Sequence, residues 1–149
     1  MELFTGYGLD YLFRWLHMLA GVTWIGLLYY FNFVQTEYFK EAEPDHKAGA
    51  IQKLVPRALW WFRWGAMVTF LSGVALLSYR HNVLTYAIVV GSLLATIMFL
   101  NVWLVIWPNQ KIVVASALQV ADGGEAIPEA ADSLAKAGLA SRTNTLFSL

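Results

Sequence analysis

Apolar and polar positions separate into long blocks along this chain. No charged residue lies between Asn82 and Gln110, and a bilayer core is crossed by a helix of about 20 mostly apolar residues. Two earlier blocks are similarly apolar, each with one arginine near an end. The pattern therefore predicts an all-α membrane bundle with three spans, forming a single membrane domain over residues 1–149. The expected spans are residues 11–34, 58–79 and 83–107.

The segments between and after these spans are polar and contain helix breakers. Residues 35–57 are expected to form a charged loop with a short helix after Asp45. Residues 108–149 are expected to form a tail. Within the tail, residues 111–121 suit an interfacial helix, and residues 128–140 begin with proline, which favours the first turn of a second short helix.

The last residues of the chain turn apolar after Ser141, Thr143 and Asn144. Serine, threonine and asparagine before an apolar run are a helix-start signal. We therefore expect the chain to end at the threshold of a truncated fourth span.

Basic residues are distributed unevenly between the two sides of the predicted bundle. The turn between the second and third spans holds Arg80 alone, whereas seven basic residues lie in the loop or the tail: Lys40, Lys47, Lys53, Arg57, Lys111, Lys136 and Arg142. Because basic residues are enriched on the cytoplasmic side of membrane proteins, we expect a multi-pass protein of a bacterial inner membrane. Its N-terminus would be outside, and the loop and the tail would face the cytoplasm.

Composition narrows the class of protein further. The chain is 58% apolar and 13% charged, whereas soluble domains are about 45–50% apolar and about 25% charged. A formal net charge of zero argues against nucleic acid as a partner. With no cysteine, the chain cannot form disulfides, thiolate metal sites or a covalent c-type haem. No carboxylate lies in residues 11–34 or between His46 and Ala121, which argues against a carboxylate proton relay in the spans.

One helix face of the first span carries the candidate chemistry. Arg14, His17, Gly21 and Trp24 are spaced by three and four residues, which places them on one face. Ionisable residues within spans usually face the protein interior and mark function. A neutral imidazole is an axial ligand of haem iron, a nearby arginine pairs with a propionate, and glycine lets a flat cofactor approach. The alternative is a histidine that hydrogen-bonds a neighbouring helix while Arg14 reaches the headgroups.

A b-type haem usually needs a second axial ligand, and His81 in the turn after the second span is the candidate. The alternative for His81 is a solvated turn residue. His46 lies in a run of charged residues whose spacing matches no standard metal site, so we interpret it as solvated. His17 is therefore the expected metal ligand of this chain, and no residue is assigned a catalytic role.

Other polar and small residues suggest helix packing. Asn32 and Asn101 lie toward the cytoplasmic ends of the first and third spans, where they can hydrogen-bond across helices. Gly65, Thr69 and Gly73 are four residues apart and predict a packing seam on the second span. Tryptophans at the cytoplasmic ends of the second and third spans are typical of an aromatic belt, with a quinone-binding platform as the alternative; these are Trp60, Trp61, Trp64, Trp103 and Trp107.

Three stretches together carry a family resemblance: residues 14–26 (RWLHMLAGVTWIG), 101–110 (NVWLVIWPNQ) and 140–145 (ASRTNT). Over nearly its whole length the chain resembles the membrane domain of the bacterial cytochrome c-linked urate oxidase (urate hydroxylase) family. The resemblance implies an inner-membrane helical domain associated with electron transfer. It also implies that full-length members carry further spans and a c-type cytochrome domain.

The chain departs from that full pattern because it lacks a Cys-x-x-Cys-His motif and stops where a further helix would follow. We therefore expect a short form that works with other membrane subunits and with a separate c-type cytochrome. The expected function is a redox subunit that binds haem b through His17, Arg14, Gly21 and Trp24, with His81 as second ligand. One alternative is a cofactor-free accessory subunit that stabilises a respiratory or oxidase complex. Another is an oxidoreductase that processes urate with partner chains.

Overall fold

The computed structural model describes residues 6–79 and 84–149, and every regular element within these ranges is a helix. The first rod is α1 (Gly6–Tyr29), which continues through the π-helical segment η2 (Tyr30–Gln35) into α2 (Thr36–Glu41). A short α3 (Pro44–Lys53) leads into α4 (Val55–Tyr79). The third rod joins α5 (Tyr86–Leu100), π-helical η4 (Asn101–Ile106) and α6 (Trp107–Ala121), and the last helix is α7 (Ala130–Phe147).

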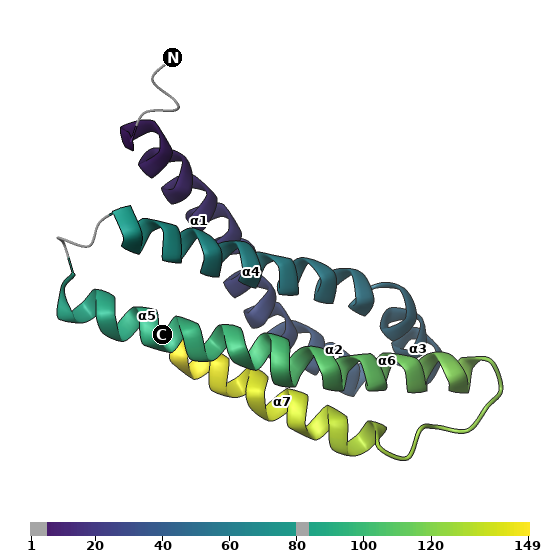
Figure 1. Ribbon diagram of the computed structural model, residues 1–149. Coiled ribbons are helices and arrows are strands. Elements are labelled where there is room, and N and C mark those ends of the chain that lie inside the picture. The colour runs from purple at the N-terminus through teal and green to yellow at the C-terminus, as the bar shows by residue number, and fades with distance from the viewer. Residues whose placement is uncertain (1–5, 80–83) are drawn as a thin grey trace.

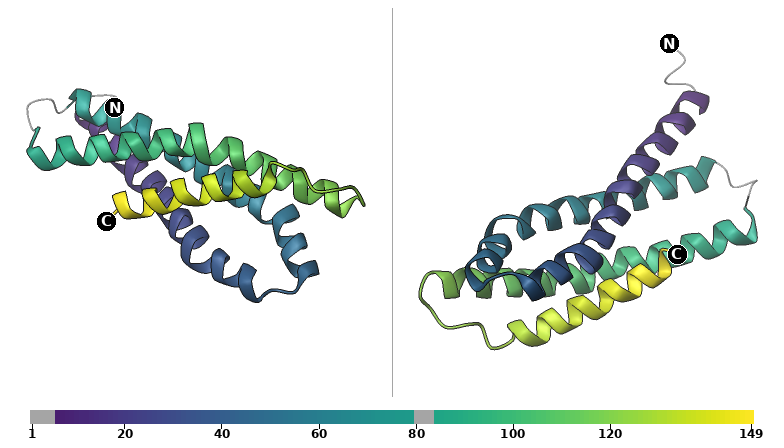
Figure 2. Two further views of the ribbon diagram at one scale, coloured as in Figure 1. Left: turned by 90° about the horizontal axis from the view of Figure 1, so that it is seen from below. Right: turned by 180° about the vertical axis from the view of Figure 1, so that it is seen from behind.

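Figure 1 shows how these rods are arranged. α4 and the α5–η4–α6 rod run antiparallel, and α1 crosses α4 at a steep angle, with its N-terminal turns extending beyond the other helices. From behind and from below (Figure 2), α7 lies alongside the α5–η4–α6 rod and runs back toward its middle. The expected all-α class is confirmed for the described residues.

Two continuous helices in the described ranges, residues 6–41 and 86–121, are long and apolar enough to cross a membrane. In their most apolar windows, only 17% and 11% of residues are buried by the rest of the chain. Large apolar side chains therefore remain uncovered along both rods, among them Met18, Val22 and Leu104. The predicted second span falls within α4, which in the described ranges is not apolar enough by the same criterion. Arg63 and several tryptophans lower its mean hydropathy.

Local sequence signals explain several helix boundaries. α3 begins at a proline, which fits the first turn because its missing N–H needs no partner there. The Thr85 side chain accepts a hydrogen bond from the backbone N–H of Ile88 and caps the start of α5. α6 ends where Gly123 takes a φ of +84°, a conformation that glycine adopts without steric cost.

The tightest helix contact is between α1 and α4. A Cβ added at Gly65 would lie 3.3 Å from the backbone nitrogen of Trp24 and 3.5 Å from the carbonyl oxygen of Ala20. Glycine at this position therefore lets the two backbones approach each other. Thr69 is buried one turn further along α4. The packing seam predicted from Gly65, Thr69 and Gly73 is confirmed as the face that α4 turns to α1.

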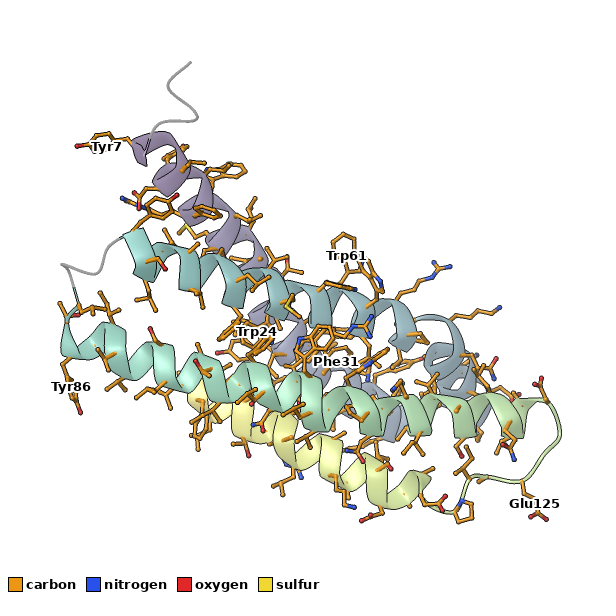
Figure 3. The ribbon with its side chains drawn as sticks, viewed as in Figure 1. Tyr7, Trp24, Phe31, Trp61, Tyr86 and Glu125 are labelled. Atoms are coloured by element: carbon orange, nitrogen blue, oxygen red, sulfur yellow. The ribbon has the colours of Figure 1, made fainter. Side chains whose placement is uncertain are left out.

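The core of the bundle lies where α1, α4, α5–η4 and α7 meet. Trp24 and Leu28 from α1 pack against residues that are at most 8% exposed: Phe62, Ala66, Met98, Val102, Ile106 and Ala140. Figure 3 shows Trp24 and Phe31 pointing between the helices, whereas Trp61 points away from them. The rings of Phe31 and Phe62 meet edge to face at a centroid distance of 5.5 Å, an arrangement that aromatic pairs favour.

α7 is fixed to the bundle by hydrogen bonds from both π-helical segments. Asn32 in η2 donates to the Ser141 hydroxyl at 2.7 Å, and Asn101 in η4 donates to the Asn144 side-chain oxygen at 2.8 Å. Asn144 is fully buried and also donates to the Met98 carbonyl at 2.9 Å. The prediction that Asn32 and Asn101 bond across helices is confirmed.

The helix start expected in residues 141–145 is wrong. α7 begins at Ala130 and continues without a break to Phe147, so Ser141 and Asn144 lie in its C-terminal half. Their polar side chains resemble helix caps in sequence, but they are used for contacts with neighbouring helices. Tertiary contacts of this kind override local preferences.

Candidate functional site

The face of α1 that was predicted to carry chemistry turns mostly into the bundle. Trp24 is 2% exposed, and His17 and Gly21 are half-buried. A Cβ at Gly21 would lie 3.9 Å from the Thr69 methyl group, so this glycine faces α4. Arg14 is the exception, because its side chain is 51% exposed and pairs with Asp10 one turn earlier.

His17 is held by the backbone of α4. Its Nδ1 atom lies 2.9 Å from the Thr69 carbonyl oxygen and 3.1 Å from the Ser72 hydroxyl oxygen. The Thr69 and Ser72 hydroxyls already donate to carbonyls of their own helix. A carbonyl oxygen can only accept a hydrogen bond, so Nδ1 is assigned as the protonated nitrogen that donates to Thr69.

This assignment leaves Nε2 of His17 with a free lone pair. Within the described residues Nε2 has no hydrogen-bond partner. In metal-binding histidines, one ring nitrogen usually donates to a carbonyl or carboxylate, and this bond fixes the ring while the other nitrogen ligates. The Thr69 contact has the form of such a supporting bond.

His17 lines a cavity of about 380 Å³ between α1, α4 and α5. This volume is in the range of sites for small organic ligands, about 300–1,000 Å³. Trp24 lines the cavity from α1, and its buried Nε1–H has no partner. The remaining walls are largely apolar and include Phe70 and Leu77 from α4 and Ile88 from α5.

Gly73 shapes the wall beside the imidazole. A Cβ at this position would lie 3.1 Å from Cε1 and 3.5 Å from Nδ1 of His17. The absence of a side chain therefore makes room for the ring. Gly91, Ser92 and Thr96 of α5 also border the cavity. The side chains of Ser92 and Thr96 add hydroxyl groups to its lining.

The structure brings together some of the predicted site residues and not others. His17 and Trp24 line the cavity, and Gly21 lies between them on the same face of α1. Arg14 does not line it. His81 lies outside the described residues. His46 is exposed on α3, and no group of three or more metal-binding side chains occurs in residues 6–79 and 84–149.

The alternative prediction, that His17 hydrogen-bonds a neighbouring helix, is confirmed by its contacts with α4. The sequence did not identify the residues that make these contacts. Thr69 and Gly73 were interpreted only as a packing seam, and Ser72 was not singled out. A small-residue pattern on α4 was a signal that a neighbouring helix approaches. Nothing in the sequence indicated that the side chain packed against these small residues would be the imidazole of His17, 52 positions before Thr69.

Residues 6–88 match the protein-family model described as urate oxidase N-terminal. The match covers more than half of the chain and includes α1 and α4, which supply His17 and its hydrogen-bond partners. No curated protein and no solved structure matches the chain.

Proposed function

The chain belongs to the urate oxidase N-terminal family, and on that basis we propose that it is a membrane-embedded redox subunit that binds a b-type haem through His17. The observation that carries this proposal is the hydrogen bond from His17 Nδ1 to the Thr69 carbonyl, at 2.9 Å beside a cavity. It orients the ring and leaves Nε2 available as an axial ligand.

The membrane setting rests on the uncovered apolar rods. A core helix of a soluble protein is mostly covered by its own chain, whereas residues 6–41 and 86–121 bury few of their apolar side chains. We propose α4 as a third span. It is the most enclosed of the three rods, with buried residues from Val55 to Ser72, so its lower hydropathy is compatible with a place among other helices. The proposed orientation keeps the N-terminus outside a bacterial inner membrane.

A bound haem would supply one-electron transfer between ferric and ferrous iron. In this chain the Thr69 carbonyl would make the imidazole a stronger ligand by accepting a hydrogen bond from its Nδ1–H. The apolar walls would exclude water and so help to set the potential of the group.

We propose that the chain relays electrons within a larger complex that includes a c-type cytochrome. Among the described residues that line the cavity, His17 is the only one with a titratable side chain. With its Nδ1 proton committed to Thr69 and Nε2 committed to iron, no general base remains there. Urate added to the purified chain alone should therefore leave the haem oxidised, and rapid reduction by urate would instead identify this chain as the oxidising unit.

The first test is a reduced-minus-oxidised absorption spectrum of the purified protein in mild detergent. We expect a b-type α-band and about one haem per chain in a pyridine haemochrome assay. The measurement should be made on material that elutes as a single species and shows a helical circular dichroism spectrum. A preparation that meets these criteria but is colourless, and retains no haem once added haemin has been removed, would favour the cofactor-free accessory subunit.

A further inference from the structure

A second cavity lies at the other end of the bundle and shares no lining residue with the His17 cavity. Its volume is about 440 Å³, and its walls come from η2, α2, α3, α4, η4, α6 and α7. We call it the basic cavity because Lys40, Lys47 and Arg142 line it. No aspartate or glutamate is among the residues that line it.

The three cations are not equally neutralised. Lys40 pairs with Glu37 at 2.7 Å. Lys47 has its ammonium 5.8 Å from the centre of the Phe39 ring. Neither Lys47 nor Arg142 forms an ion pair with a carboxylate among the described residues. The cavity therefore carries two positive charges that a bound anion can neutralise.

The inner wall of the basic cavity is apolar. Phe62 and Ile106 line it and are 1% and 3% exposed. Gln35 lines it as well, and its side-chain oxygen is buried without a hydrogen-bond partner. The occupant that suits the two cations and the apolar wall has an anionic group and an apolar portion.

We propose that the basic cavity binds an acidic phospholipid of the phosphatidylglycerol class. Its phosphate would contact Lys47 and Arg142, and an acyl chain would lie against accessible apolar lining residues such as Leu134, which is 54% exposed. Basic pockets between transmembrane helices on the cytoplasmic side bind anionic headgroups. This inference rests on the proposed membrane setting and does not require a haem at His17.

The test is native mass spectrometry of the detergent-purified chain titrated with phosphatidylglycerol or phosphatidylcholine that carry identical acyl chains. We expect selective retention of phosphatidylglycerol. Each cation near the membrane surface contributes to anionic lipid binding, so Arg142→Gln should lower retention about fivefold, and Lys47→Gln with Arg142→Gln about 25-fold.

Lys136→Gln is the matched control, because Lys136 lies on the same helix but pairs with Asp132 and does not line the basic cavity. This variant should retain phosphatidylglycerol as the unmodified chain does. Equal losses in Lys136→Gln and Arg142→Gln would overturn the inference, as would equal retention of the two lipids. Displacement of the lipid by millimolar inorganic phosphate would also overturn it, since the site would then recognise a free anion.

These experiments distinguish a failure of the haem proposal from a failure of the lipid proposal. His17→Ala should lose haem and keep its selectivity for phosphatidylglycerol. A chain that never binds haem but loses lipid selectivity only on substitution of Lys47 and Arg142 would support the lipid site alone. A haem-containing chain without lipid selectivity would contradict the lipid site and leave the haem proposal intact.

Discussion

His17→Ala is expected to abolish the b-type absorption band of the purified chain. The substitution removes the only imidazole among the described residues that line the cavity between α1, α4 and α5, and the Thr69 carbonyl then has no ring to orient. Haem content should fall by at least about tenfold, because loss of an axial ligand removes the strongest bond to the protein. The measurement is the pyridine haemochrome assay on equal amounts of folded protein.

Two controls separate ligand loss from misfolding. His46→Ala removes an exposed histidine on α3 and should retain full haem content. His17→Gly leaves an imidazole-sized space, so added imidazole should restore part of the band. If His17→Ala keeps an unchanged b-type spectrum, the iron is held elsewhere and the assignment to His17 is wrong.

Asn144→Ala is expected to destabilise the fold more than other single changes on α7. Asn144 is fully buried, accepts from Asn101 at 2.8 Å and donates to the Met98 carbonyl at 2.9 Å. Its removal leaves the Asn101 amide without that acceptor and the carbonyl without that donor. Leaving buried polar groups unpaired costs about 1–3 kcal/mol, so we expect a loss of about 2 kcal/mol and a Tm lower by about 5 °C.

Thr143→Ala is the neighbouring control, since the Thr143 hydroxyl bonds only the Leu139 carbonyl of its own helix. Its Tm should change by less than about 1 °C, as expected for a substitution away from interhelical contacts. In the double variant with Asn101→Ala, the losses should not add, because the two amides share one hydrogen bond. Additive losses, or equal Tm values for Asn144→Ala and Thr143→Ala, would show that α7 is not anchored by this contact.

Long apolar blocks made the helices predictable, whereas their docking depended on contacts between distant residues. The run without charge that starts at Asn82 predicted the α5–η4 rod, because an apolar run of this length is typical of a membrane-spanning helix. Asn32 and Asn101 were predictable as interhelical donors for the same reason, since an amide in an apolar run needs a partner. Ser141 was misread because the same side chain that caps a helix start also bonds a neighbouring helix.

The side of the candidate site on α1 was predictable from the sequence, whereas the side on α4 was not. The three- and four-residue spacing of His17, Gly21 and Trp24 fixed which face turns inward, and the structure agrees. The same spacing included Arg14, whose side chain is 51% exposed and pairs with Asp10. The contact with Thr69 depends on the crossing of α1 and α4 at Gly65, which helix periodicity does not specify.

The central claim is that Nε2 of His17 ligates a prosthetic group in the cavity that this histidine shares with Trp24. An experimental density map of the purified, coloured protein tests it most directly. We expect planar density joined to Nε2 of His17, with Nδ1 still within hydrogen-bond distance of the Thr69 carbonyl. A map in which side chains or lipid fill this cavity and Nε2 has no ligand would contradict it.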